Sequence, residues 1–248
     1  MEHITRYTQV LVVAISLCLV SSCVGASVST ILTEENETQQ KENRQALRAL
    51  RWEETVRASA LKSARRWEGV VERTGNNDHP MITIAMRLCG LPGDKGYAWC
   101  AACISEIFNF TSRITAPVTA RAREFFDSNV IWDRRWNTQP PIHLLRPAQV
   151  VGYRLHGKWD ENHVEMLIRP TERLAYIAGG NTSGKGQFDP DTYDILDPAS
   201  NTVQREADGF YYKVRYWHQI DVIADYCLTG EDWKERYMYY INAIKSKL

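Results

Sequence analysis

Apolar residues recur at helical spacing through the first part of the chain. Between residues 56 and 71 they fall every three or four positions, which predicts a helix that stops before Gly75. Asp78 and Pro80 resemble the N-cap and first turn of a second helix, which Gly90 is placed to end. The first part of the domain is therefore predicted to be helical.

A third helix is predicted to begin at Cys100, and a short fourth one at Pro117. Beyond residue 147 the pattern changes to short apolar runs separated by turn residues, which is typical of β-strands. These predicted strands cover residues 148–155, 163–169, 173–178 and 210–216. A closing helix is predicted from one more apolar stripe: Trp233, Tyr237, Tyr240, Ile241 and Ile244. Helices followed by antiparallel strands predict an α+β fold.

The N-terminal segment differs from the rest in composition. Residues 10–20 are almost entirely small and apolar, but the run is shorter than the roughly 20 residues that span a membrane. Residues 20–23 read Val-Ser-Ser-Cys and resemble a bacterial lipobox, which implies cleavage before Cys23 and lipidation of its sulfur. We therefore expect a signal peptide over residues 1–22 and attachment to the periplasmic face of the outer membrane. An uncleaved signal anchor is the alternative.

The remaining chain divides into a polar linker and one domain. Residues 33–45 are almost wholly polar, so residues 23–46 are predicted to form a tether behind the lipidated cysteine. Residues 47–248 are long enough for a single domain with a buried core. The 30 basic and 30 acidic residues balance without a basic block, which argues against nucleic acid as a partner. We expect a monomer that is held at the membrane through its lipid.

Three polar side chains form a candidate catalytic set. Cys100 is predicted to lie at a helix N-terminus, where partial positive charge favours a thiolate and N–H groups can hold an oxyanion. His163 begins a predicted strand, where an imidazole can accept a proton and return it to a leaving amine. Asn181 follows the next strand, and its amide can orient the imidazole. In this order, a thiol, an imidazole and an amide indicate a cysteine hydrolase.

Each of these residues also has a structural interpretation. A free cysteine is often buried, and an asparagine after two glycines is often a turn residue. Cys100 and Cys103 also form a CxxC pair, which is typical of thioredoxin-like redox proteins, but a predicted loop precedes it instead of an apolar strand. A redox protein is therefore kept as the weaker alternative, and Cys103, one turn further along the same helix face, is predicted to pack in the core. A zinc site is not expected, because no second paired ligand motif is present.

The order and spacing of these motifs are similar to those of the CHAP and NlpC-type peptidoglycan hydrolases of the papain-like superfamily. The similarity covers roughly residues 55–220. The segments that carry it are Gly75-Asn76-Asn77-Asp78, Tyr97-Ala98-Trp99-Cys100-Ala101-Ala102, residues 147–153, His163-Val164 and Gly179-Gly180-Asn181. The resemblance implies a papain-like fold in which a helix that begins with the nucleophile packs on an antiparallel sheet.

The resemblance also implies an activity and its residues. Amide bonds of wall stem peptides would be cleaved by Cys100 as nucleophile, His163 as base and Asn181 as third member, without a metal or an organic cofactor. Tyr97 and Trp99 match positions beside the cleft and are candidate substrate-binding residues. The enzyme would be an N-acetylmuramoyl-L-alanine amidase or an endopeptidase.

The chain departs from the family pattern close to the histidine and the asparagine. The residue two after the histidine is commonly small, whereas here it is Glu165. Some members carry a glutamate shortly before the asparagine, where this chain has Gly179. These departures leave open a second interpretation, a catalytically inactive lipoprotein that binds wall peptides in the same cleft.

Overall fold

The computed structural model describes residues 27–93, 95–112, 114–154, 162–197 and 208–227. Contacts between Cα atoms divide the chain into two units between Arg51 and Trp52. Helix α2 (Ser27–Arg65) contributes residues to both units. Cys23, the predicted signal peptide and the predicted C-terminal helix lie outside the described residues.

Helix α2 begins much earlier than the apolar pattern predicts. The polar segment 33–45, which we expected to be an extended tether, is helical. Glutamate, glutamine, lysine and arginine are good helix formers, so local propensity favours this conformation even where the helix buries no apolar face. Side-chain pairs four residues apart support it further. Gln39 Nε2 donates to Asn43 Oδ1 at 3.3 Å, and Arg44 Nη2 donates to Gln40 Oε1 at 3.5 Å.

The second unit continues with short helices. Their bounds are α3 (Pro80–Leu88), α4 (Cys100–Ser105), the π-helix η1 (Glu106–Thr111) and the 3-10 helices η2 (Ala122–Phe126), η3 (Ile142–Leu144) and η5 (Trp217–Gln219). Helix α4 begins at Cys100, as predicted, and all six of its residues are buried. The short helix that we expected at Pro117 begins at Ala122 instead.

The N-terminus of α3 is held by a different residue from the one predicted. His79 is its N-cap, and the Nδ1 atom of His79 accepts a hydrogen bond from the backbone N–H of Met81 at 3.2 Å. Asp78 instead accepts a hydrogen bond from the backbone N–H of Arg73 at 2.8 Å. The carboxylate that we took for a helix cap therefore closes the preceding turn.

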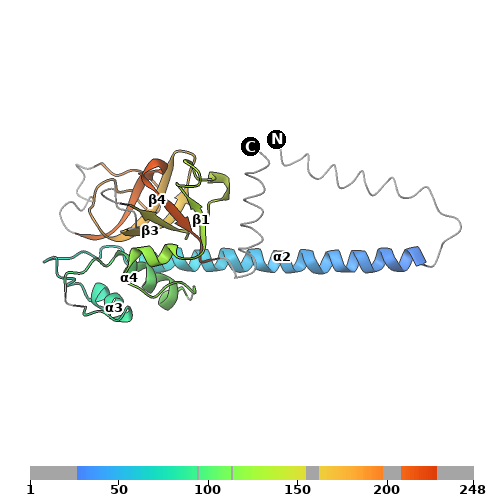
Figure 1. Ribbon diagram of the computed structural model, residues 1–248, viewed down its shortest axis with the longest axis horizontal. Helices are drawn as coiled ribbons and strands as arrows, with labels where there is room; N and C mark the ends of the chain where they lie inside the picture. The colour runs from blue at the N-terminus through green and yellow to red at the C-terminus, as the bar shows by residue number, and fades with distance from the viewer. Residues whose placement is uncertain (1–26, 94, 113, 155–161, 198–207, 228–248) are drawn as a thin grey trace. The chain divides into compact units, whose positions relative to one another are not determined.

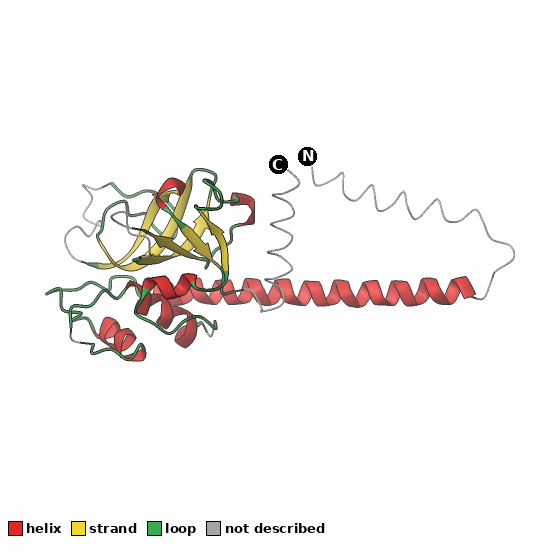
Figure 2. Cartoon of the chain, viewed as in Figure 1, coloured by secondary structure: helices red, strands yellow, loops and turns green. Residues whose placement is uncertain are grey.

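Within the described residues, six antiparallel strands form one sheet in the order β1-β6-β2-β3-β4-β5 (Figure 1). Their bounds are β1 (Val130–Asp133), β2 (Val150–Tyr153), β3 (His163–Pro170), β4 (Leu174–Thr182), β5 (Gly209–Tyr216) and β6 (Val222–Ala224). The four predicted strands correspond to β2 to β5. The combination of helices with an antiparallel sheet confirms an α+β fold (Figure 2).

The two faces of the sheet pack against different apolar clusters. Val164 and Met166 of β3 belong to the larger cluster, which includes α4, and Leu167 belongs to a smaller one. Figure 1 shows α3 and α4 on one side of the strands. Since successive residues of a strand point to opposite faces, His163 and Glu165 share the face of Leu167. His163 is also the first residue of β3, so it lies at the end of that strand.

A buried ion pair joins α2 to the residue that follows β6. Arg57 Nη2 lies 2.7 Å from Asp225 Oδ2, and Arg57 Nε donates to Glu53 Oε1 at 2.9 Å. The Nη1 group of Arg57 donates to the backbone carbonyl of Pro147 at 2.7 Å. Gln149 Nε2 supplies a second donor to Asp225 Oδ2 at 2.8 Å. The buried guanidinium of Arg57 and the buried carboxylate of Asp225 are therefore each neutralised by an opposite charge and satisfied by hydrogen bonds, as buried charges require.

Candidate active site

Cys100 is the first residue of α4, and only 2% of it is exposed. Its thiol interacts electrostatically with the side chain of His163 and with the backbone N–H groups of Val164 and Ala101. Burial by itself would raise the pKa of the thiol, but His163 and the two N–H groups bring it below the ordinary value. Cys100 is therefore a cysteine whose thiolate is favoured despite burial.

His163 lies opposite Tyr153 of β2 and is 7% exposed. Its Nε2 atom is 3.2 Å from Glu165 Oε1, close enough for an ion pair, although the N–H is not aligned for a hydrogen bond. Burial would lower the pKa of the imidazole, but Glu165 and Cys100 raise it above the ordinary value. The opposite shifts of His163 and Cys100 favour a thiolate–imidazolium pair.

Glu165 is fully buried and lies two residues after His163 on the same face of β3. Its Oε1 atom also lies 3.5 Å from Arg215 Nη2. Burial would raise the pKa of the Glu165 carboxyl, but His163, Arg215 and Lys213 together hold it well below the ordinary value. A carboxylate whose ionised form is favoured therefore lies beside the imidazole, and Cys100, His163 and Glu165 form a continuous set.

Asn181 occupies a different place from the one that the resemblance implies. It lies near the end of β4 and lines a pocket beside His163, but within the described residues it makes no hydrogen bond to that imidazole. Its φ angle of 56° is in the left-handed region, which asparagine tolerates better than most residues. The structure places Glu165, and not Asn181, against Nε2 of His163.

The glycine pair before Asn181 makes room on both faces of β4. A Cβ atom added at Gly179 would lie 2.6 Å from Glu165 Cγ, and one added at Gly180 would lie 2.0 Å from Trp99 Cζ3. Real Cβ atoms essentially never approach so closely. Both glycines are therefore needed for β4 to pass between the carboxylate on one side and the indole on the other.

Tyr97 and Trp99 have opposite environments. Trp99 is fully buried, stacks on Trp67 with ring centroids 5.9 Å apart, and donates its Nε1–H to Glu72. It therefore fixes the start of α4 from within the core, and its ring does not face solvent. Tyr97 is 48% exposed and remains a candidate for substrate contact.

The described cysteines differ in their chemistry. Cys89, Cys100, Cys103 and Cys227 are all free thiols. Burial raises the pKa of Cys89, raises that of Cys103 well above the ordinary value and raises that of Cys227 to about 12. Among these four thiols, Cys100 alone has a lowered pKa. Cys103 is completely buried, as expected for a residue that packs in the core.

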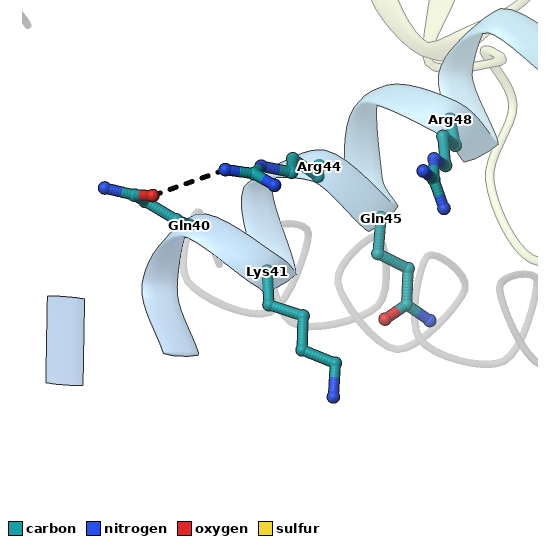
Figure 3. Close-up of a pocket in the computed structure, with 5 residues that line it drawn as sticks. All are labelled: Gln40, Lys41, Arg44, Gln45 and Arg48. Atoms are coloured by element: carbon teal, nitrogen blue, oxygen red, sulfur yellow. Dashed lines mark hydrogen bonds between the residues drawn. The ribbon is translucent and has the colours of Figure 1, made fainter. Parts of the chain in front are cut away.

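A small pocket lies beside the imidazole. Its volume is about 180 Å³, and its lining residues are Tyr153, His163, Asn181, Thr182, Arg215 and Gln219. Another hollow lies along α2 within the first unit and is lined by Gln40, Lys41, Arg44, Gln45 and Arg48 (Figure 3). That surface carries no cysteine, histidine or carboxylate, whereas the pocket beside His163 is lined by the imidazole that acts on Cys100.

We found no match for this chain among protein-family models, curated proteins or solved structures. Within the described ranges, no three histidine, cysteine, aspartate or glutamate side chains are grouped so that they could hold a metal ion. No helix in the described part of the chain combines the length and the apolar character that a membrane span requires.

Sequence reasoning missed the carboxylate at the centre of this site. Glu165 was seen only as a departure from a family pattern, although residues two apart in a strand share a face. That alternation was the available signal, because His163 and Glu165 both lie in a predicted strand. Arg215 and Lys213 had no comparable signal, since their proximity depends on β5 lying next to β4.

Proposed function

We propose that this protein is a papain-like cysteine amidohydrolase that cleaves amide bonds in peptidoglycan stem peptides. The observation that carries the proposal is that Glu165 Oε1 lies 3.2 Å from His163 Nε2, while His163 and Cys100 shift each other's pKa in opposite directions. Amide hydrolysis by a cysteine nucleophile needs a thiol that is polarised by an imidazole, and a third group that orients this imidazole. The class of substrate comes from the sequence resemblance.

In the proposed acylation step, the thiolate of Cys100 attacks the scissile carbonyl carbon and forms a C–S bond. The carbonyl oxygen becomes an oxyanion, for which the backbone N–H of Cys100 at the start of α4 is the proposed donor. The imidazolium of His163 then gives its proton to the leaving nitrogen as the C–N bond breaks. The products are a free amine and a thioester on Cys100.

In the proposed deacylation step, His163 takes a proton from water, and the resulting hydroxide attacks the thioester carbonyl. The C–S bond breaks, the acid product leaves, and the thiolate is restored beside the imidazolium. Glu165 keeps the ring in position through both steps and stabilises its positive charge.

We further propose that the enzyme is a monomeric lipoprotein held through Cys23 at the periplasmic face of the outer membrane. The lipobox-like segment that ends in Cys23 supports this location. Labelling with a radioactive fatty acid in a bacterial host, compared between the natural chain and Cys23→Ala, tests it. The anchor proposal fails if both chains incorporate the same label.

The function is tested by mass spectrometry of purified muropeptides incubated with the protein. Fragments should appear with the natural chain and with Cys103→Ser, but not with Cys100→Ser. The Cys103 variant is a matched control because it removes a thiol from the same helix. The masses of the fragments identify which amide is cut. Equal fragment patterns for Cys100→Ser and the natural chain would refute the proposed nucleophile.

A specific observation favours one alternative, a binding protein without turnover. Cys100 is 2% exposed and His163 is 7% exposed, so a substrate carbonyl has little access to the sulfur in this conformation. Alkylation by iodoacetamide separates the two functions. An active Cys100 should react faster than Cys89, Cys103 or Cys227, whereas equal and slow alkylation of all four favours binding alone.

A further inference from the structure

The pocket beside His163 is smaller than a typical ligand site. Its volume of about 180 Å³ falls below the roughly 300–1,000 Å³ of pockets that enclose a whole small ligand. It lies next to the imidazole that contacts the candidate nucleophile. A space of this size and position fits one substituent of a substrate, close to the bond that is cut.

The polar groups that line this pocket are mainly hydrogen-bond donors. Thr182 Oγ1 accepts from Lys213 Nζ at 2.8 Å, which leaves its own O–H to donate. Gln219 Oε1 accepts from the backbone N–H of Tyr216 at 2.9 Å, which leaves its NH₂ group to donate. We call the residues that line this space, with Thr182 and Gln219 among them, the donor pocket.

The donor pocket has two further donors that are buried. Within the described residues, the hydroxyl of Tyr153 and the Nε–H of Arg215 are both buried without a hydrogen bond, although the Glu165 carboxylate acts on both groups. Tyr153 is 3% exposed, and the guanidinium of Arg215 lies over its ring, 5.5 Å from the centroid. Buried donors without partners are costly, and an oxygen-rich ligand would satisfy them.

The charged side chains around the donor pocket also favour an anionic, oxygen-rich ligand. With Cys100 and His163 as an ion pair, the site holds three positive groups, His163, Arg215 and Lys213, against two negative ones, Cys100 and Glu165. The remaining acid that acts on Lys213 is Asp208, which is exposed at the edge of the sheet. Burial, and to a smaller extent Arg215, lowers the pKa of Lys213 to about 8, although Glu165 and Asp208 act to raise it. When the exposed Asp208 is left out, the site therefore has one more positive than negative group.

We propose that the donor pocket binds a carboxylate that the substrate carries next to its scissile amide, and that Arg215 selects for it. The selected substrate class is then a peptide with a free carboxylate beside the cleaved bond. This identification of the substrate rests on the proposed hydrolase function. The binding of a carboxylate by the pocket does not, and it can be measured without turnover.

Two alkylating reagents that differ only in charge test the proposal. Iodoacetate carries a carboxylate where iodoacetamide carries a neutral amide, and in both reactions the thiolate forms an S–C bond while the C–I bond breaks and iodide leaves. Rates at Cys100 are followed in the full chain by mass spectrometry of the Cys100 peptide. The readout is the ratio of the iodoacetate rate to the iodoacetamide rate, which cancels any general change in thiol reactivity.

Variants of Arg215 test whether this residue is responsible for the preference for iodoacetate. The imidazolium of His163 would attract iodoacetate by itself, so the ratio in the natural chain is only the reference. Arg215→Gln is expected to lower it about tenfold, because a charge-assisted hydrogen bond is lost. Arg215→Lys should retain part of the preference. Arg173→Gln makes the same change of charge at an exposed residue outside the pocket lining and should leave the ratio unchanged.

The outcomes separate this inference from the proposed function. An unchanged ratio in folded Arg215→Gln overturns the carboxylate site, even if muropeptides are cleaved. A lowered ratio supports the site, even if no cleavage is found. If Arg215→Gln does not fold, protection of Cys100 from iodoacetamide is measured in the natural chain. N-acetylglycine should protect Cys100 better than N-acetylglycine amide, and equal protection overturns the proposal.

Discussion

Glu165 Oε1 lies 3.2 Å from His163 Nε2, and the two residues are separated by a single position on β3. The orienting carboxylate and the base are therefore held by the same strand. Their relative position depends on the geometry of one short backbone segment, and not on how two strands pair. Loss of charge at Glu165 should therefore act directly on the imidazole and, through it, on Cys100.

Replacement of Glu165 by glutamine keeps the shape of the side chain and removes its charge. We expect kcat/KM for amide cleavage to fall by about 10² or more, because the imidazolium loses its counter-charge. The pKa of His163 should fall and that of Cys100 should rise, which a pH profile of Cys100 alkylation measures. Asn181→Ala is the comparison variant and should have the smaller effect. The reverse order would restore Asn181 as the third member.

The pH dependence of thiol alkylation should distinguish Cys100 from Cys103. The pKa of Cys100 lies below the ordinary 9.0, so its thiolate persists as the pH falls through 9 and is lost only at the lower folded pKa. The pKa of Cys103 lies well above 9.0, so its alkylation should stay slow up to strongly alkaline pH. Iodoacetamide rates for each peptide, measured from pH 5 to pH 10, test this. Parallel profiles for the two thiols would contradict it.

A methyl group added at Gly180 should destabilise the protein because it would clash with the ring of Trp99. In Gly180→Ala the new Cβ atom would lie 2.0 Å from Cζ3 of the buried Trp99 ring. Either strand β4 or the indole ring must therefore shift. We expect unfolding free energy to fall by about 1–3 kcal/mol, the usual cost of overpacking. Urea denaturation of the double mutant with Trp99→Leu provides the control. Because that change removes the obstructing ring atoms, the two costs should be less than additive.

Loss of the buried arginine should destabilise the domain strongly. In Arg57→Met, Asp225 keeps its burial but loses its counter-ion at 2.7 Å. We expect a loss of about 3–5 kcal/mol in the free energy of unfolding, as for one partner removed from a buried pair. Arg121→Met is the matched control, since Arg121 forms an exposed pair with Glu124 at 3.4 Å. Its loss should stay within about 1 kcal/mol, and similar losses in both variants would contradict the argument.

The elements that depend on local sequence were predictable. The starts of the helices at Pro80 and Cys100 and the presence of strands β2 to β5 follow from turn residues and apolar spacing. Strands β1 and β6, of four and three residues, were missed. They pair with each other across about 90 positions of sequence, and a short strand of this kind is stabilised by its partners and not by its own pattern.

The candidate site was predictable in part for the same reason. Cys100 and His163 could be singled out because each begins an element and carries suitable chemistry. Asn181 was given the third role from its place after the next strand and from a family pattern, whereas Glu165 is the residue that lies against His163 Nε2. The cationic groups Arg215 and Lys213 could not be placed, because strand pairing between β4 and β5 decides which side chains meet. Proximity across strands is a property of the folded sheet.

The space that Gly179 leaves for Glu165 also limits how such a site can change over evolutionary time. A carboxylate side chain at position 179 of β4 would occupy the same space as the Glu165 side chain of β3. A lineage that moved the acid from one strand to the other would pass through an intermediate with both side chains or with neither. The first is overcrowded and the second leaves the imidazole without its counter-charge. The glutamate and the glycine are therefore expected to be inherited together as one unit.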